Sequence, residues 1–245
     1  MTPRHLEVES KASAGNRLAR NLAAVKRRRA ATHRDEVTKE AILRLKAWQS
    51  NRLAGTYPDL LASPRYRAAA HFFMEDLYGP KDFSQRDADV ERILPKLIAL
   101  LPPAALSTLA DAVELDELSE ELDAKVLAAH GNGAISQGSY AAAYAQAATP
   151  DQRRRQIALI RAIGEALDGL TRVPLLLSTL KLMRGPARMA GLAALQVFLE
   201  KGFVTVKKMR GVEEFLDIIT LRETLLMERL FGRVADPFAG LAETG

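Results

Sequence analysis

Four charged side chains fall on faces that otherwise carry the apolar residues of expected helices. They are Arg86 and Asp87 in a helix that starts near residue 84, Arg188 in helix 186–208, and Glu223 in helix 212–231. Because an unpaired charge is too costly to bury, we expect these residues to contact one another or a ligand. Two interpretations stay open: an internal ion-pair network that fixes the helix register, and a polar pocket that holds a bound group.

His71, Glu75 and Tyr78 line up on a second face that could do chemistry. A histidine and a glutamate one helical turn apart can bind a metal ion or transfer protons, and such pairs also form ordinary hydrogen bonds on helix surfaces. None of the four histidines lies in a Glu-x-x-His pair, the pattern of di-iron carboxylate bundles. The sequence also lacks the Gly-x-Ser-x-Gly, His-Glu-x-x-His and Walker motifs. We therefore predict no metal site, no cofactor and no catalytic residue.

The positive charge of the chain is concentrated near its N-terminus. Residues 11–34 contain no acidic residue and eight basic ones: Lys11, Arg17, Arg20, Lys26, Arg27, Arg28, Arg29 and Arg34. We interpret the cluster Lys26, Arg27, Arg28 and Arg29 as a candidate anion-binding site for an acidic protein, a membrane surface or nucleic acid; a solvated basic helix is the alternative. Because no aromatic residues interleave with this cluster, nucleic acid would be held through its phosphates without base readout.

Composition is typical of a soluble globular protein, with 48% hydrophobic and 27% charged residues among 245. The chain has no cysteine, which excludes disulfides, thiolate chemistry and cysteine-based metal centres. Its first residues include acids and no apolar run, unlike a secretory signal. The most apolar stretch, VPLLLSTLKLM, is far shorter than the ~20 residues that cross a bilayer. We therefore expect a cytoplasmic protein without a transmembrane segment.

Helix signals recur along the chain, and no window alternates as a strand would. Asp35 begins a helix through about residue 53, and Thr149 caps another through about residue 170, with Gln152 completing a capping box. After residues 102–103, the apolar phase breaks near residues 114–116, which predicts a bend or two shorter helices. We predict an all-α protein. Its parts are a single multi-helix bundle of roughly eight helices at 35–232, a basic and partly disordered N-terminal extension at 1–34, and a loose C-terminal tail at 233–245.

Residues 63–101 form the expected centre of the bundle, two helices joined by a turn. Ser63-Pro64 begins the first helix, Gly79-Pro80 ends it, and Ser84 begins the second. Here HFFMEDLYGPKDFSQRDADVERILP resembles an uncharacterised bacterial family named for a Phe-Phe-Leu-Glu-Glu-Leu-Tyr motif, with Met for Leu and Asp for Glu in this chain. LMRGPARMAGLAALQVFLEKGF looks similar as well, and the resemblance covers roughly residues 35–232. It implies an all-helical domain of unknown function and transfers no activity or site residue.

Three functional hypotheses follow from these patterns. The leading one is a non-enzymatic cytoplasmic interaction or regulatory protein whose basic N-terminal segment contacts an acidic protein partner or nucleic acid. The alternative is an enzyme or small-ligand carrier with a polar pocket between helices around Arg86, Arg188 and Glu223. The third is a structural subunit whose exposed apolar surface is covered by a homo-oligomer.

Overall fold

The computed structural model describes residues 9–32, 34–77 and 84–244. These residues form twelve α-helices, one π-helical turn and one 3-10 turn, with no strand among them. In chain order the elements are α1 (Lys11–Thr32), α2 (Glu36–Thr56), α3 (Pro58–Ala62), α4 (Arg67–Phe72), the π turn η1 (Phe73–Leu77), α5 (Ser84–Leu100), α6 (Pro103–His130), α7 (Gln137–Ala147), α8 (Pro150–Thr171), α9 (Leu176–Leu182), α10 (Arg184–Met189), α11 (Ala193–Met209), α12 (Glu213–Phe231) and the 3-10 turn η2 (Leu241–Glu243). The all-α prediction is confirmed, and the helices outnumber the expected eight.

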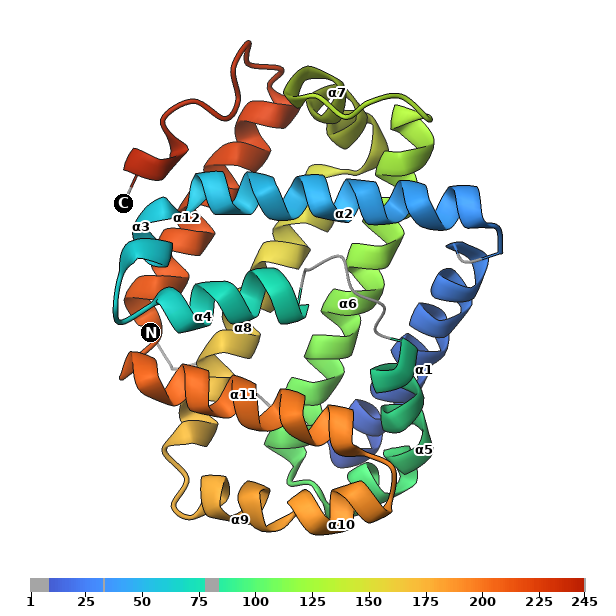
Figure 1. Cartoon of the computed structure of the whole chain (residues 1–245), viewed down its shortest axis with the longest axis vertical. Helices are drawn as coiled ribbons and strands as arrows, with labels where there is room; N and C mark the ends of the chain where they lie inside the picture. The colour runs from blue at the N-terminus through green and yellow to red at the C-terminus, as the bar shows by residue number, and fades with distance from the viewer. Residues whose placement is uncertain (1–8, 33, 78–83, 245) are drawn as a thin grey trace, which may run out of the picture.

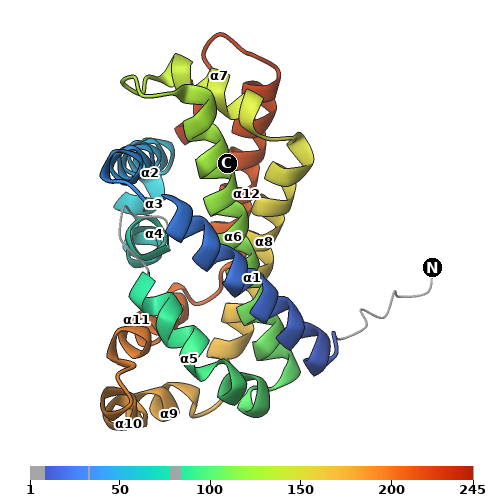
Figure 2. The ribbon, with the colours of Figure 1, turned by 90° about the vertical axis from the view of Figure 1, so that its right-hand side faces the viewer.

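The helices form two crossing layers (Figure 1). Helices α6, α8 and α12 run along the long axis, and α2, α4 and α11 cross over them. The view turned by 90° shows α2, α4 and α11 stacked on one side of the α6, α8 and α12 layer (Figure 2). Helix α7 lies at one end of the molecule, and α9 and α10 lie at the other. Polar groups between the layers therefore come from helices far apart in the sequence.

Helix α1 packs along α6, so the basic N-terminal segment belongs to the bundle. Ala14, Leu18 and Val25 have no exposed surface. Leu18 packs with Leu106 of α6, because α1 carries an apolar stripe as well as its charges. The expectation of a basic extension outside the bundle is therefore wrong for residues 11–32. The domain boundaries drawn at residues 34 and 232 stay predictions.

Helix α6 is one continuous helix of 28 residues, so of the two alternatives, a bend or two shorter helices, the second is wrong. Where the apolar phase breaks, acidic residues of α6 face basic residues of α1. Arg29 Nη2 lies 2.7 Å from Asp116 Oδ1, and Arg28 Nε lies 2.8 Å from Glu117 Oε1. Ion pairs thus take the place of apolar contacts on this face of α6. The apolar periodicity of the sequence is therefore interrupted here, although the helix continues.

Two expected long helices differ in the structure: one is divided into two, which raises the helix count, and one is shortened. Helix 186–208 is split into α10 and α11 at Gly191, whose φ of +69° suits glycine. The helix expected to start at Ser63-Pro64 begins only at Arg67, after a turn, and ends in the π turn η1. The expected stop at Gly79-Pro80 lies outside the described residues.

Two helix starts and one close helix contact explain how the central helices are placed. Asp35 Oδ1 accepts a hydrogen bond from the Thr38 backbone at 2.8 Å, and the predicted capping box of Thr149 and Gln152 is confirmed. Helices α8 and α12 meet at Gly164, where a Cβ atom would lie only 2.7 Å from a methyl carbon of Leu216. Glycine at this position lets the two helices approach closely.

The C-terminal segment packs against the bundle over its described part, residues 233–244. Leu241 is buried beside Ile42, Leu45 and Leu226. Arg229 Nη1 donates a hydrogen bond to the Ala239 carbonyl at 2.6 Å. These contacts differ from the loose tail that the sequence predicts. Among the described helices, none is both long and apolar enough to cross a membrane.

Candidate ligand-binding site in the helical core

The structure does not bring the four charged residues of the apolar faces together. Arg188 is exposed on α10, because the break at residues 190–192 interrupts the face that would have carried it inward. The side chains of Arg86 and Asp87 lie outside the described part of the chain. Glu223 lies between helices and is paired with Arg52, which is not among the partners that the sequence suggests for it.

Glu223 lies on α12 and contacts two residues of the crossing layer. Its Oε1 atom lies 2.5 Å from Arg52 Nη1 of α2 and accepts a hydrogen bond from the Tyr57 hydroxyl at 2.8 Å. Burial, followed by the negative charge of Glu223, raises the pKa of Tyr57 well above its ordinary value. Tyr57 therefore stays a neutral donor, and Arg52 balances the charge of Glu223.

This pair borders a cavity of about 70 Å³ between the two layers. Helices α2, α6, α7, α8 and α12 and the π turn surround it. Its polar lining consists of Gln49, Arg52, Ser119, Asp123, Tyr140, Tyr144, Arg153, Gln156 and Glu223. Six of these residues carry ionisable side chains that could bind an anion or transfer a proton: Arg52, Asp123, Tyr140, Tyr144, Arg153 and Glu223.

Arg153 is the residue whose hydrogen-bonding needs are least satisfied in this cavity. It is only 5% exposed, and its guanidinium carbon lies 4.0 Å from the ring centre of Tyr144. Nη1 donates to Gln156 Oε1 at 3.0 Å, while Nε and Nη2 have no hydrogen-bond partner among the described residues. Among the residues that the structure describes, no carboxylate lies within ion-pair distance of Arg153. A buried guanidinium in this state is costly unless a further group binds to it.

Asp123 lines the same cavity and its charge interacts with that of Arg153, but burial opposes its ionisation. Its Oδ1 atom accepts a hydrogen bond from Gln49 Nε2 at 2.9 Å. Burial raises the pKa of Asp123 above its ordinary value, and the charge of Glu120 adds to this, against the lowering effect of Lys46 and Arg153. Burial therefore makes the ionised form of Asp123 costly, and its Oδ1 atom is already engaged by Gln49.

Glu120 behaves in the opposite way one turn earlier on α6. Its Oε1 atom lies 2.6 Å from Lys46 Nζ and 3.1 Å from Arg29 Nη2. Burial raises the pKa of Glu120, but the two cations outweigh it and leave the pKa below its ordinary value. Glu120 is thus an ionised structural residue, whereas Asp123 borders the cavity.

The remaining predicted site residues lie on the surface or in ion pairs. His71 Nδ1 is 3.2 Å from Glu75 Oε1, both side chains are more than half exposed, and Tyr78 lies outside the described residues. In the basic cluster, Lys26 pairs with Glu91, and Arg27 is exposed. Arg28 pairs with Glu117 and Glu121, and Arg29 pairs with Asp116 and Glu120. Among the described residues, no group of three His, Cys, Asp or Glu side chains could hold a metal ion.

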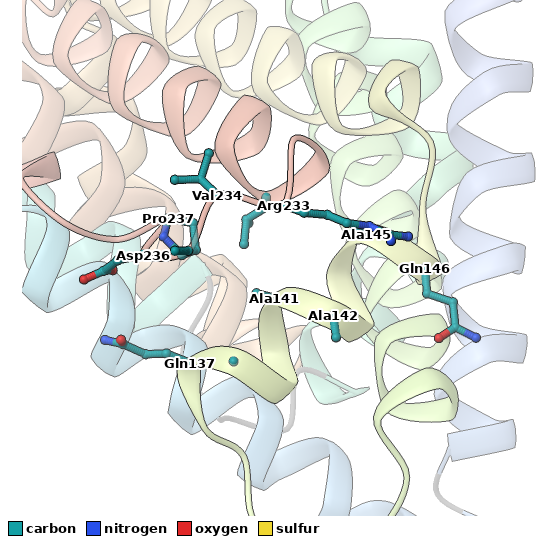
Figure 3. Close-up of a pocket in the computed structure, with 12 residues that line it drawn as sticks. Gln137, Ala141, Ala142, Ala145, Gln146, Arg233, Val234, Asp236 and Pro237 are labelled. Atoms are coloured by element: carbon teal, nitrogen blue, oxygen red, sulfur yellow. The ribbon is translucent and has the colours of Figure 1, made fainter.

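A larger groove lies between α7 and residues 233–237 (Figure 3). Its volume is about 820 Å³, and Figure 3 shows Ala141, Ala142 and Ala145 on one side of it and Arg233, Val234, Asp236 and Pro237 on the other. Arg233 and Asp236 are its charged residues. It lacks the converging buried polar groups of the core cavity, so it is the weaker candidate for a specific small ligand.

Arg52 and Arg153 were missed as site residues although the sequence contains a signal for both. Arg153 precedes Ile160, a core residue of the same expected helix, by seven positions, and Arg52 follows Leu45 by seven. Seven residues are two helical turns, so both arginines lie on the continuation of an apolar stripe. The run of three arginines at 153–155 instead suggests a solvated helix surface.

The family model described as a domain of unknown function (DUF8198) matches residues 28–237. The chain belongs to this family. The DUF8198 match includes every residue that lines the core cavity. A search of curated proteins and a search of solved structures find no significant match. The link of DUF8198 to the Phe-Phe-Leu-Glu-Glu-Leu-Tyr motif and to bacteria stays a prediction.

Proposed function

We propose that this protein binds a small oxyanion, a carboxylate or a phosphate, in the core cavity and acts as a non-enzymatic ligand-binding protein. The observation that carries the proposal is Arg153, a buried guanidinium with two N–H groups that lack partners. Carboxylate and phosphate oxygens match the planar donor geometry of arginine. A cavity of about 70 Å³ has room for a group of a few non-hydrogen atoms.

The charge balance of the cavity supports an anion over a neutral ligand. Arg52 is paired with Glu223, and no carboxylate of the described residues lies within ion-pair distance of Arg153. The positive charge of Arg153 is then in excess, and a bound anion would neutralise it. The Nε atom of Arg52 also lacks a partner among the described residues and offers a further donor.

The contact of the basic N-terminal segment with an acidic protein partner or nucleic acid is a second proposal with weaker support. Lys26, Arg28 and Arg29 are already paired with acids of α5 and α6, which leaves Arg27 and Arg20 as exposed cations of this helix. Deleting residues 1–34 would remove buried Leu18, so neutralising Arg20 and Arg27 is the cleaner test. Cytoplasmic location and homo-oligomer formation likewise stay proposals.

The anion proposal is tested by thermal unfolding with formate, acetate, phosphate and sulfate, each at constant ionic strength against chloride. A bound ligand raises the unfolding free energy by about 2.7 kcal/mol when its concentration is a hundred times Kd. Trp48, the one tryptophan of the chain, lies 4.2 Å from cavity residue Tyr140 between ring centres, so its fluorescence provides a direct readout.

Arg153→Met is the decisive variant, and Arg154→Met is its control, because Arg154 is exposed on the same helix. We expect Arg153→Met to abolish the anion effect, with little loss of stability in the absence of the anion, since a costly buried charge is removed. Arg154→Met should respond to the anion as the unmodified protein does. The proposal is wrong if no anion of this series stabilises the protein, or if Arg153→Met retains the full response.

A further inference from the structure

We propose that the end of the molecule formed by α9, α10 and α11 docks onto an anionic lipid surface. This surface is separate from the core cavity and does not depend on the proposed function. We call it the α9–α11 end, defined as residues 172–210. Figure 1 and Figure 2 both place α9 and α10 at one extremity of the molecule, with α11 beside them.

The α9–α11 end carries a net positive charge of +7, although Arg172 is paired with Asp168 just before it. Its eight basic residues are all exposed: Arg172, Lys181, Arg184, Arg188, Lys201, Lys207, Lys208 and Arg210. It contains one acid, Glu200, which accepts two hydrogen bonds from Arg184 Nε at 2.8 and 2.9 Å. The hydrogen bond from Arg184 lowers the pKa of Glu200 to about 2. The whole chain has a net charge of +5, so the rest of the molecule is net negative.

Exposed apolar side chains gather at the same end. Of the ten large hydrophobic residues exposed in the described part of the chain, seven lie here: Val173, Leu175, Leu182, Met183, Met189, Val197 and Leu199. Leu175, Leu182 and Met189 are 78%, 79% and 85% exposed. Leu175 also has a φ of +63°, a conformation that is unfavourable for leucine and that holds it outside the core.

A groove of about 560 Å³ between α10 and α11 combines the two features. Four basic residues line it, Arg184, Arg188, Lys201 and Lys208, together with Ala193, Val197, Val204, Gln196, Thr205 and the one acid Glu200, which is paired with Arg184. It can accept anionic headgroups, because four basic side chains and one already paired acid border it. The most exposed apolar residues, Leu175, Leu182 and Met189, do not line the groove. A partner that covers the groove and these three residues must therefore have a broad surface.

A lipid surface fits this combination better than other acidic partners. An acidic helix would fill the groove and leave the three exposed residues uncovered. A nucleic acid would contact the basic residues, but it gains little from exposed leucine and methionine. An anionic bilayer attracts clustered Lys and Arg, and its acyl boundary accepts apolar side chains over a broad area.

The test is co-sedimentation of the full-length protein with vesicles of phosphatidylcholine alone, or of phosphatidylcholine with 30% phosphatidylglycerol. We expect binding to the anionic vesicles and not to the neutral ones. The binding should weaken between 0.1 M and 1 M salt, because the screening length falls from about 10 Å to about 3 Å. Failure to bind anionic vesicles overturns the proposal.

Two double variants separate the contributions of charge and apolar insertion. Arg188→Gln with Lys208→Gln should weaken vesicle partitioning about 25-fold, at roughly fivefold per cation removed near the surface. Leu182→Ser with Met189→Ser should weaken vesicle partitioning as well. Because both side chains are exposed, their replacement leaves the fold intact. Matched controls are Arg20→Gln with Arg27→Gln, and Val37→Ser with Val234→Ser, which should bind as the unmodified protein does.

Two outcomes would replace the lipid with another partner. If a mixed-sequence DNA duplex binds more tightly than the vesicles, and Leu182→Ser with Met189→Ser leaves duplex binding unchanged, the surface is a nucleic-acid site. If the protein is a dimer that this apolar variant dissociates, and vesicles do not bind, the surface is an interface between two copies. Equal loss of vesicle binding in the α1 control variant would also overturn the proposal, because the effect would then be one of net charge.

Discussion

Arg222 of α12 holds Asp59 of α3 through two parallel hydrogen bonds, from Nη1 to Oδ1 at 2.7 Å and from Nη2 to Oδ2 at 2.9 Å. The arginine is 2% exposed and also donates to the Thr56 carbonyl at 2.9 Å and to the Thr244 carbonyl at 2.7 Å. One side chain therefore joins the end of α2, the short helix α3 and the C-terminal segment. Arg222 precedes Glu223 in the sequence, and Glu223 contacts Arg52 of α2 and Tyr57.

We expect Arg222→Met to lower the free energy of unfolding by about 1–3 kcal/mol, because it removes a buried guanidinium from the half-exposed Asp59 and leaves the buried Thr56 carbonyl without this donor. Urea unfolding followed by Trp48 fluorescence measures this change. Arg161→Met is the control: its ion pair with Asp217 is exposed, so the loss should stay within about 1 kcal/mol. Equal losses in the two variants would contradict the structural role of Arg222.

Glu223→Gln should destabilise the protein by about 1–3 kcal/mol, because the partly buried Arg52 loses its counter-charge while the shape of the side chain is kept. The same unfolding measurement applies. A change well below 1 kcal/mol would argue against a buried, partnered carboxylate at this position.

Asp123 should make both stability and anion binding depend on pH. Its pKa is higher in the folded protein than in the unfolded chain, so the folded state holds the proton more tightly. Stability therefore falls as the pH rises from the ordinary aspartate range through the raised folded pKa, and above that the full cost of burying the charge persists. Anion affinity should fall over the same range, because ionised Asp123 repels the ligand.

The variant Asp123→Asn isolates this effect, because its amide oxygen can still accept the hydrogen bond from Gln49 Nε2. We expect thermal unfolding scans from pH 4 to pH 8 to show a weaker pH dependence in Asp123→Asn than in the unmodified protein. The variant should be the more stable of the two at neutral pH. An unchanged pH profile would show that Asp123 does not titrate with a raised pKa.

Two glycines of α8 should respond in opposite directions to the same substitution. Gly164→Ala should destabilise the protein by about 1–3 kcal/mol, because the new methyl group would lie 2.7 Å from Leu216. Gly169→Ala should stabilise it by about 0.5–1 kcal/mol, because no atom lies within 4 Å of the new Cβ atom and alanine favours the helix. Differential scanning calorimetry of both variants checks the pair, and a loss of stability in both would refute the close contact.

The helical class and several helix starts were predictable because their signals are local. The capping box at Thr149 and the cap at Asp35 involve residues three apart, and the structure has both. The continuity of α6 and the packing of α1 were not predictable, because Arg28 and Arg29 find their partners about ninety residues later. The residues of the cavity were not predictable for the same reason, because Arg52, Arg153 and Glu223 come from three helices. Arg188 was wrongly included, because the helix break at Gly191 leaves it on the surface.

The packing of α1 against α6 sets an order of events during synthesis. Helix α1 is made first, but Arg28 pairs with Glu121, 93 residues later in the chain. At about 5–20 residues per second, the ribosome needs roughly 5–20 seconds to make that length. Within this interval α5 is made first and supplies Glu91 for Lys26 and Val90 for Leu22, whereas Glu117 and Glu121 of α6, the partners of Arg28, follow only later. Completion of α6 is therefore the step that commits the N-terminal helix to the fold.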